Sequence, residues 1–390
     1  MHRRDVLRLA GLSMALPTVS IAAPPVASPQ PTAPHPTRSL VLLELKGGND
    51  GLNTLIPYAD PQYARLRPTL AIAPARVIDL NDRLGLHPAL RPVMPAWDAG
   101  ELAWIQGVGY PRPNRSHFRS IDIWETGSDS DEVLEQGWLA RALPIRAPGD
   151  LPDVVVLGGD DGPARGGDLR IITLASAERF VDDARRLQPL DATPAHLTPA
   201  LDHLLTVRAA TQAAGAEFRR SIERLDTTPT PFPKSPIGRQ LQEAARMLQA
   251  GMAIPVVKVQ IGSFDTHANQ LKRQERLLAQ LADALAAFRQ TLRHTGHWDR
   301  VLVMSYSEFG RRPDENASGG TDHGTAAPHL VLGGRVKGGL YGEMPDLNAL
   351  EKSVLRNTVD YRQLYDTVAA RWWDNLPAST GMTSRDKTWL

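Results

Sequence analysis

Short apolar runs, separated by loops and by longer segments with helical spacing, set the hydrophobic pattern of this chain after residue 38. The runs lie at residues 40–45, 102–105, 154–157, 256–261, 301–304 and 330–332. Short runs rich in β-branched residues and bounded by glycine-containing loops are typical of buried strands. The alternation of such strands with helical segments predicts an α/β fold with a mixed, mainly parallel central sheet flanked by helices.

Helical periodicity is longest between about residues 176 and 250, where Ala, Leu and Arg recur every three or four positions. Prolines within residues 227–236 divide this stretch into two helical parts. Residues 358–374 also have the pattern of one amphipathic helix. We therefore expect a single α/β domain over residues 39–390, with a helical insertion at about 176–250.

The first 24 residues have the pattern of an export signal. They combine a basic start, an apolar run over residues 7–16 and a small-residue end at Ala22 and Ala23. The adjacent Arg3 and Arg4 resemble the twin-arginine type of signal, although a basic, amphipathic start to an ordinary helix is the alternative. The apolar run is too short to span a membrane.

A proline-rich linker follows at residues 25–38. The signal predicts passage through the twin-arginine translocase, a periplasmic or secreted location, and no transmembrane segment in the mature protein.

Charge and cysteine content narrow the chemistry. A formal net charge of +1 without a basic cluster argues against nucleic acid as the main partner. The chain has no cysteine, which excludes disulfides, thiolate metal sites and cysteine nucleophiles. A divalent metal would therefore be held by His, Asp and Glu, which favours zinc, with manganese or calcium as alternatives.

Acidic and imidazole side chains recur at the predicted strand ends: Asp50, Asp265 with His267, Glu308 and His323. Ligands collect at the carboxyl ends of strands in α/β sheets, and these charges on one rim would repel unless a cation joined them. The pattern predicts a metal site built from these five residues. The alternatives are a turn or cap role for Asp50, and an Asx turn at Asp265 with His267 exposed.

A second group of candidates follows the strand at residues 102–105. Asn114 or Ser116 can cap a helix there, which places His117 in its first turn. The free N–H groups of a helix start, together with Arg115, favour an anion. Ser116 is either a nucleophile or only the helix cap, and His117 is a candidate proton donor or acceptor. In the later loop, Arg311 and Asn316 are candidates to complete a substrate pocket.

Several long motifs resemble one family. They are LVLLELKGGNDGLNTLIPY, PNRSHFRSIDIWETG, FDTHANQ, SYSEFGRRPDENASGGTDHGTAAPHLVLG, VKGGLYG and NTVDYRQLY. They resemble the exported bacterial DUF1501 family, which is regarded as a distant relative of the alkaline phosphatase and sulfatase superfamily. The resemblance implies an alkaline-phosphatase-like fold and metal-assisted hydrolysis of phosphate or sulfate esters. It also implies an anionic ester substrate, such as a glycan or another envelope component.

The resemblance gives several of these residues roles. Asp50, followed by glycine, resembles a ligand to one metal, and the pair Asp265 and His267 resembles the grip on another. Glu308 stands where relatives have an aspartate ligand, and His323 resembles the final histidine ligand. An alternative pairs Asp322 with His323 and makes His329 the last ligand.

Two positions depart from the superfamily pattern. Phe309 replaces a histidine ligand, and Pro111 stands where relatives have a nucleophile. Ser116 or a metal-activated water could replace that nucleophile. The competing function is a non-catalytic, metal-stabilised binding protein of the cell envelope, and a plain α/β domain with satisfied polar turns is a third possibility.

Overall fold

The structure is a computed structural model that describes residues 38–144, 151–186, 199–223, 230–374 and 388–390. Residues 36–390 form one compact unit by their contacts. The predicted export signal and all of the predicted linker except residue 38 lie outside the described residues. The extent of the domain therefore stays a prediction.

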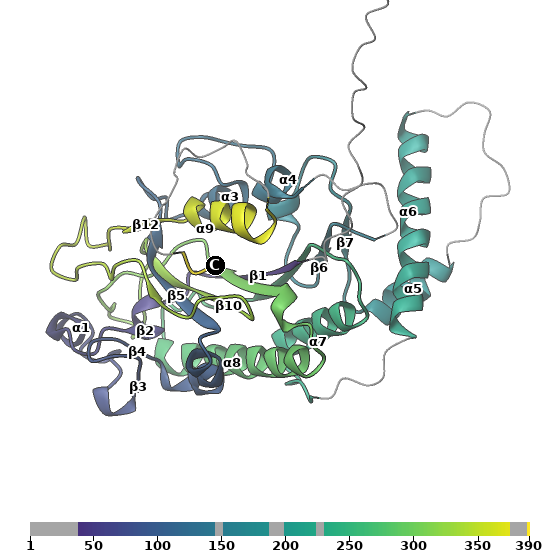
Figure 1. Ribbon diagram of the computed structural model, residues 1–390. Helices are drawn as coiled ribbons and strands as arrows, with labels where there is room; N and C mark the ends of the chain where they lie inside the picture. Colours follow the sequence, from purple (N-terminus) through teal and green to yellow (C-terminus); the bar gives the residue numbers. More distant parts are fainter. Residues whose placement is uncertain (1–37, 145–150, 187–198, 224–229, 375–387) are drawn as a thin grey trace, which may run out of the picture. The chain divides into compact units, whose positions relative to one another are not determined.

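A central sheet organises this unit (Figure 1). Its strands lie in the order β11 (Gly339–Tyr341), β5 (Leu102–Gly109), β10 (Ala327–Gly333), β9 (Val301–Tyr306), β1 (Ser39–Leu45), β8 (Val256–Ile261), β6 (Val154–Val156) and β7 (Ile171–Thr173), with β12 (Val359–Asp360) also paired to β5. The strands from β9 to β7 run parallel, and β10 is antiparallel to both of its neighbours. The predicted mixed, mainly parallel sheet is confirmed.

Strand β1 lies in the middle of the sheet and is buried on both faces, which explains its nearly continuous apolar sequence. Val41, Leu43 and Leu45 pack in one core layer, whereas Leu40 and Leu42 pack in the other. The first layer contains α7 (Pro236–Gln249) and α8 (Gln270–His294). The second contains α3 (His117–Thr126), α4 (Trp138–Ala142) and α9 (Arg362–Thr367), as Figure 1 shows.

The remaining elements are shorter or peripheral to the site. They are α1 (Pro61–Leu66), α2 (Met94–Asp98), α5 (Ala177–Arg186), α6 (Pro199–Ile222), and a small sheet of β2 (Leu55–Ile56), β4 (Gly85–Leu86) and β3 (Ile78–Asp79). Helices α5, α6 and α7 occupy the stretch predicted as a helical insertion. No helix in the described ranges is both long and apolar enough to cross a membrane.

The prediction of one continuous helix over residues 358–374 is wrong. Residues 359 and 360 pair with β5, and the N–H of Tyr361 donates to the carbonyl of Gly109. Helix α9 begins only after this pairing and ends in a π-helical turn, Val368–Trp372. Strand pairing therefore overrides the helical pattern of the first residues.

The carboxyl ends of β1, β8 and β9 share one edge of the sheet because these strands are parallel. The start of β10 reaches the same edge because β10 runs in the opposite direction. A residue that follows β9 and a residue that precedes β10 can therefore meet, which would be impossible if β10 were parallel.

An ionic cluster around the buried Lys258 lies on the α3 side of the sheet. The Nζ of Lys258 lies 3.0 Å from Glu44, 3.2 Å from Asp160 and 3.9 Å from Glu125. Burial raises the pKa of Glu125 to about 8, and the nearby Lys258 only partly offsets this. The loop after β6 covers the cluster, and a Cβ on Gly162 would lie 1.9 Å from the Glu125 carboxylate. The Gly-rich sequence of this loop therefore has a packing reason.

This burial predicts a pH dependence of stability. In the unfolded chain Glu125 has its ordinary pKa of 4.5, so its contribution to stability is complete below about pH 4.5 and is lost as pH rises through about 8. The variant Glu125→Gln stays neutral throughout. Relative to this variant, the wild-type free energy of unfolding should fall by about 2–4 kcal/mol between about pH 5 and pH 8. Urea unfolding at several pH values measures this, and a difference independent of pH would contradict it.

Candidate metal centre

A glycine turn after β1 brings two of the strand-end loops together. Gly47 has a φ of 115°, and a Cβ there would lie 2.4 Å from the backbone nitrogen of Asp265. Its N–H donates to both carboxylate oxygens of Glu308, at 2.9 and 3.0 Å. Only glycine therefore permits the close approach of the loops that carry Asp265 and Glu308.

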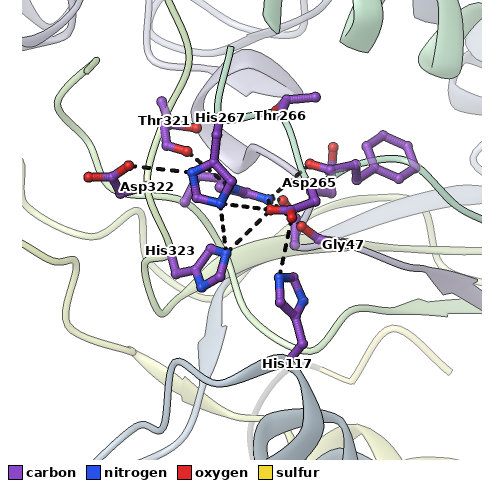
Figure 2. A network of polar contacts seen from close by, with 12 residues as sticks. Gly47, His117, Asp265, Thr266, His267, Thr321, Asp322 and His323 are labelled. Atoms are coloured by element: carbon purple, nitrogen blue, oxygen red, sulfur yellow. Dashed lines mark hydrogen bonds and ion pairs between the residues drawn. The ribbon is translucent and has the colours of Figure 1, made fainter. Parts of the chain in front are cut away.

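Three imidazoles converge on the carboxylate of Asp265 (Figure 2). The Nε2 atoms of His267 and His323 lie 3.0 and 3.3 Å from its Oδ1, and Nε2 of His117 lies 3.5 Å from its Oδ2. Ligating atoms of His117, Asp265 and His323 all lie within 4.8 Å of one another. The residues come from the loop after β8, the start of α3 and the segment before β10.

The other ring nitrogen of each histidine faces an acceptor. Nδ1 of His117 lies 2.8 Å from Glu308, and Nδ1 of His267 lies 3.4 Å from Asp322. Nδ1 of His323 lies 2.9 Å from the carbonyl oxygen of Arg115. Carboxylates and carbonyls only accept, and the carboxylate of Asp265 is an acceptor as well, so both nitrogens of each ring face an acceptor. A neutral ring has one N–H, so a ring that donates from Nδ1 presents the lone pair of Nε2 to Asp265.

With this tautomer, no positive charge separates the Nε2 atoms from one another or from the carboxylate of Asp265. The Nε2 atoms of His267 and His323 are 3.0 Å apart, and both lie against the carboxylate of Asp265. Lone pairs in such contact repel unless a proton or a cation lies between them. Histidines that donate Nδ1–H to an acceptor and turn Nε2 inward are the usual arrangement around a bound metal. The four residues can therefore hold a divalent cation.

The pKa shifts follow from these contacts. Burial raises the pKa of Asp265, but the hydrogen bond and charge of Arg311 together with the contacts of His267 and His323 outweigh it, so that the pKa of this carboxyl lies below its ordinary value. The hydrogen bond to Glu308 raises the pKa of His117, whereas burial lowers the pKa of His323. The side chains of His117, Asp265, His267 and His323 are 34, 44, 45 and 23% exposed, so solvent and a ligand can reach the centre.

Arg311 is a buried residue that supports the loops around the centre. Its side chain is fully buried, and Nη2 lies 2.5 Å from Oδ1 of Asp265. The guanidinium also donates to the carbonyl oxygens of residues 47, 48, 264 and 321. The structure thus places Arg311 as a clamp on three loops, not in the open pocket expected for a substrate-binding residue.

Asn316 also shapes a loop. Its amide donates to the carbonyl of His267 at 3.0 Å and to Asp322 at 3.2 Å, and its carbonyl accepts from the N–H groups of Ser318 and Gly320. All of these contacts are internal. The side chain therefore supports His267 and Asp322, and its substrate-binding role stays a prediction.

Ser116 and Arg115 lie at the start of α3 and are exposed. Ser116 occupies the N-cap position, but its side chain makes no cap hydrogen bond. Its N–H donates instead to the side chain of Asn114, at 2.8 Å. The hydroxyl of Ser116 is therefore not committed to capping, and the carbonyl of Arg115 is committed to His323.

Asp50 lies apart from the imidazoles. Its carboxylate accepts from both terminal nitrogens of Arg67, at 2.5 and 2.9 Å, and from the buried amide of Gln270. Arg67 and Asp50 are almost completely buried. The oxygens of Asp50 are thus occupied by a cation of the protein itself. Sequence reasoning overlooked Arg67 because an arginine that ends a short helix reads as a surface residue.

The structure therefore brings together three of the five predicted metal residues, Asp265, His267 and His323. Glu308 contacts Nδ1 of His117, on the side of that ring that faces away from Asp265. His117 itself joins the three residues around the carboxylate. The ring of Phe309 lies 4.8 Å from the ring of His117 and 4.5 Å from that of His323. The buried phenylalanine thus packs beside the imidazoles at the position where relatives were expected to carry a ligand.

The buried pair of Asp50 and Arg67 generates a prediction about stability. The variant Arg67→Met leaves an unpaired buried carboxylate, which should lower the free energy of unfolding by about 3–5 kcal/mol. The double variant with Asp50→Asn should recover a large part of that loss, because no unpaired charge remains. Urea unfolding followed by tryptophan fluorescence measures both. A single variant as stable as wild type would contradict the assignment.

Three solved structures are similar to this chain, and each shares little sequence with it. One is the lipoteichoic acid synthase LtaP from Listeria monocytogenes, with 10% identity, a TM-score of 0.35, and coverage of 88% of this chain and 73% of the other. Another is the PsFucS1 sulfatase from Pseudoalteromonas sp., with 10% identity, a TM-score of 0.38, and coverage of 88 and 69%.

A third is a protein in the alkaline phosphatase superfamily from Vibrio parahaemolyticus, with 10% identity, a TM-score of 0.32, and coverage of 80 and 64%. No curated protein matches the sequence. The family model described as "Protein of unknown function (DUF1501)" matches residues 137–373, more than half of the chain. The chain therefore belongs to the DUF1501 family.

Proposed function

We propose that His117, Asp265, His267 and His323 bind a divalent metal ion, and that the protein is an exported, metal-dependent hydrolase of phosphate or sulfate esters. One observation carries the metal site. Three Nε2 atoms face one carboxylate while each Nδ1 is held by an acceptor. Without a cation, this arrangement would bring lone pairs together at a partly exposed surface.

The donor set favours zinc. Imidazole nitrogen and one carboxylate oxygen suit zinc or manganese, whereas calcium prefers a shell of oxygen atoms. In the proposed centre, Glu308, Asp322 and the carbonyl of Arg115 orient the three rings. Such outer partners fix the tautomer and raise the basicity of a ligating histidine.

A bound divalent metal would supply a Lewis acid to an ester oxygen and would lower the pKa of a nearby water or hydroxyl. The protein would bind and orient the anion. The start of α3 offers backbone N–H groups beside the centre, and Arg115 adds a positive charge there. Because His117 turns Nε2 toward Asp265 and shares its Nδ1 proton with Glu308, we assign it to metal binding in preference to proton transfer.

The second candidate is a non-catalytic, metal-stabilised binding protein of the cell envelope. The count of protein ligands favours it, because four side chains complete a tetrahedral zinc shell and a catalytic zinc usually keeps one position for water. The two candidates share the metal site and differ only in hydrolysis. A glycan or another envelope component would be the ligand in either case.

The metal site predicts a sharp difference between two histidine variants. Wild-type protein and the variant His294→Ala, which changes an exposed histidine at the end of α8, should each retain about one zinc per chain after dialysis. The variant His267→Ala should lose zinc affinity by about 100-fold or more, because it removes a direct ligand. Elemental analysis and chelator competition measure the binding. Equal zinc content in His267→Ala and wild type would contradict the site.

Hydrolysis is tested separately on the zinc-loaded protein with phosphate monoesters, phosphate diesters and sulfate esters. A hydrolase should turn over at least one class, and His267→Ala should abolish that activity. Loss of activity in Ser116→Ala with normal zinc binding would assign the nucleophile to this hydroxyl, whereas full activity would assign attack to water. A zinc-loaded wild type that is inactive on every class would favour the binding protein.

A further inference from the structure

Two loops carry three of the four proposed ligands, and they lie directly against each other. Thr266 separates Asp265 from His267, and Thr321 lies two residues before His323. The N–H of Thr321 donates to the carbonyl of Thr266 at 3.2 Å. The spacing between these loops therefore determines whether the three ligands can meet at one ion.

A buried side-chain amide also bridges the two loops. Gln270, the first residue of α8, is fully buried, and its Oε1 accepts from the hydroxyls of Thr266 and Thr321, at 3.0 and 2.6 Å. Both threonines are also buried. On the other side, Nε2 of Gln270 donates to Asp50. Each polar atom of the amide thus has a fixed partner, and none of these partners is a proposed metal ligand.

We propose that Gln270 is a positioning residue of the metal centre, which sets the separation of the loops that carry Asp265, His267 and His323. This inference rests on the metal site proposed above. A metal tolerates deviations of only about 0.2 Å in its ligand distances, so a small change of loop spacing costs affinity. The two threonine hydroxyls need an acceptor because buried polar groups are rarely left unpaired. Both hydroxyls share Oε1 of Gln270 as their acceptor, and they keep it only while both loops remain in contact with Gln270.

The asymmetry of the amide explains why glutamine suits this position. The oxygen side faces two hydroxyl donors, and the nitrogen side faces a carboxylate. A glutamate would keep acceptors for the threonines, but it would oppose the charge of Asp50. The ion pair of Asp50 and Arg67 holds the nitrogen side in place, which fixes the oxygen toward the loops.

The closing experiment compares two variants of the full chain, Gln270→Met and Gln274→Met. Gln274 is a buried glutamine one turn further along α8, and its amide donates to the carbonyl of Asp50 and to the side chains of Asn49 and Thr54. Among the hydrogen bonds of the described residues, none joins the side chain of Gln274 to either ligand loop. Both variants remove a buried amide from the same helix, so both should lower the melting temperature of the metal-free protein.

Only Gln270→Met should weaken zinc binding, by about 10- to 100-fold in chelator competition. Gln274→Met should stay within about twofold of wild type. A purely structural role would not separate these two numbers. Equal zinc affinities in the two variants would therefore overturn the inference, whether both are unchanged or both are weakened to the same extent.

A milder pair keeps the test usable if Gln270→Met does not fold. Thr321→Val removes one of the two bridges, and Thr291→Val changes a buried threonine of α8 whose hydroxyl has no hydrogen-bond partner within the described ranges. Thr321→Val should weaken zinc binding several-fold, and Thr291→Val should not. A folded Thr321→Val with wild-type affinity would overturn the positioning role. Wild-type protein that binds no zinc would instead overturn the metal site itself.

Discussion

The site depends on one electrostatic constraint, the convergence of three imidazole lone pairs on the carboxylate of Asp265. Each histidine has its Nδ1 within 2.8–3.4 Å of a separate acceptor, so the direction of each Nε2 is fixed by a contact outside the centre. Neutral rings that donate from Nδ1 make the arrangement costly unless a proton or a cation lies between the Nε2 atoms, and the proposed metal ion would supply that charge. The loops at the strand ends would then share one role, which is to hold the proposed metal ion.

The rest of the structure holds those loops in place. The antiparallel course of β10 brings the segment of His323 to the edge where β1, β8 and β9 end. Arg311 then joins three loops through backbone carbonyls, and the glycines at 47 and 320 permit contacts that a Cβ would block. Behind these lies the buried network of Asp50, Arg67 and Gln270, which links the loops to α8.

Sequence patterns predicted the sheet well because buried parallel strands leave short, continuous apolar runs. They also predicted that Asp265, His267 and His323 lie at one rim, where the structure brings them together, since each lies beside a predicted strand. They could not assign Asp50, because its partner Arg67 is distant from any motif and only the folded chain brings the two together. The clamp role of Arg311 was hidden for a similar reason, because its partners are backbone carbonyls that have no signature in the sequence.

The helix predicted over residues 358–374 shows another limit of periodicity. Its first residues fit a helix, yet the open edge of β5 offers hydrogen bonds that a local pattern cannot include. The sequence also predicted only part of the environment of His117. Its place at a helix start was predicted, whereas the contact of its Nδ1 with Glu308 depends on how α3 packs beside β9.

The most direct test of the account is anomalous diffraction at the zinc edge from crystals of the zinc-loaded protein. We expect one strong peak surrounded by Nε2 of His117, His267 and His323 and an oxygen of Asp265, at about 2.0–2.2 Å. Asp50 should remain on Arg67. A zinc peak coordinated by Asp50, or the absence of any peak among these three histidines, would contradict the central claim.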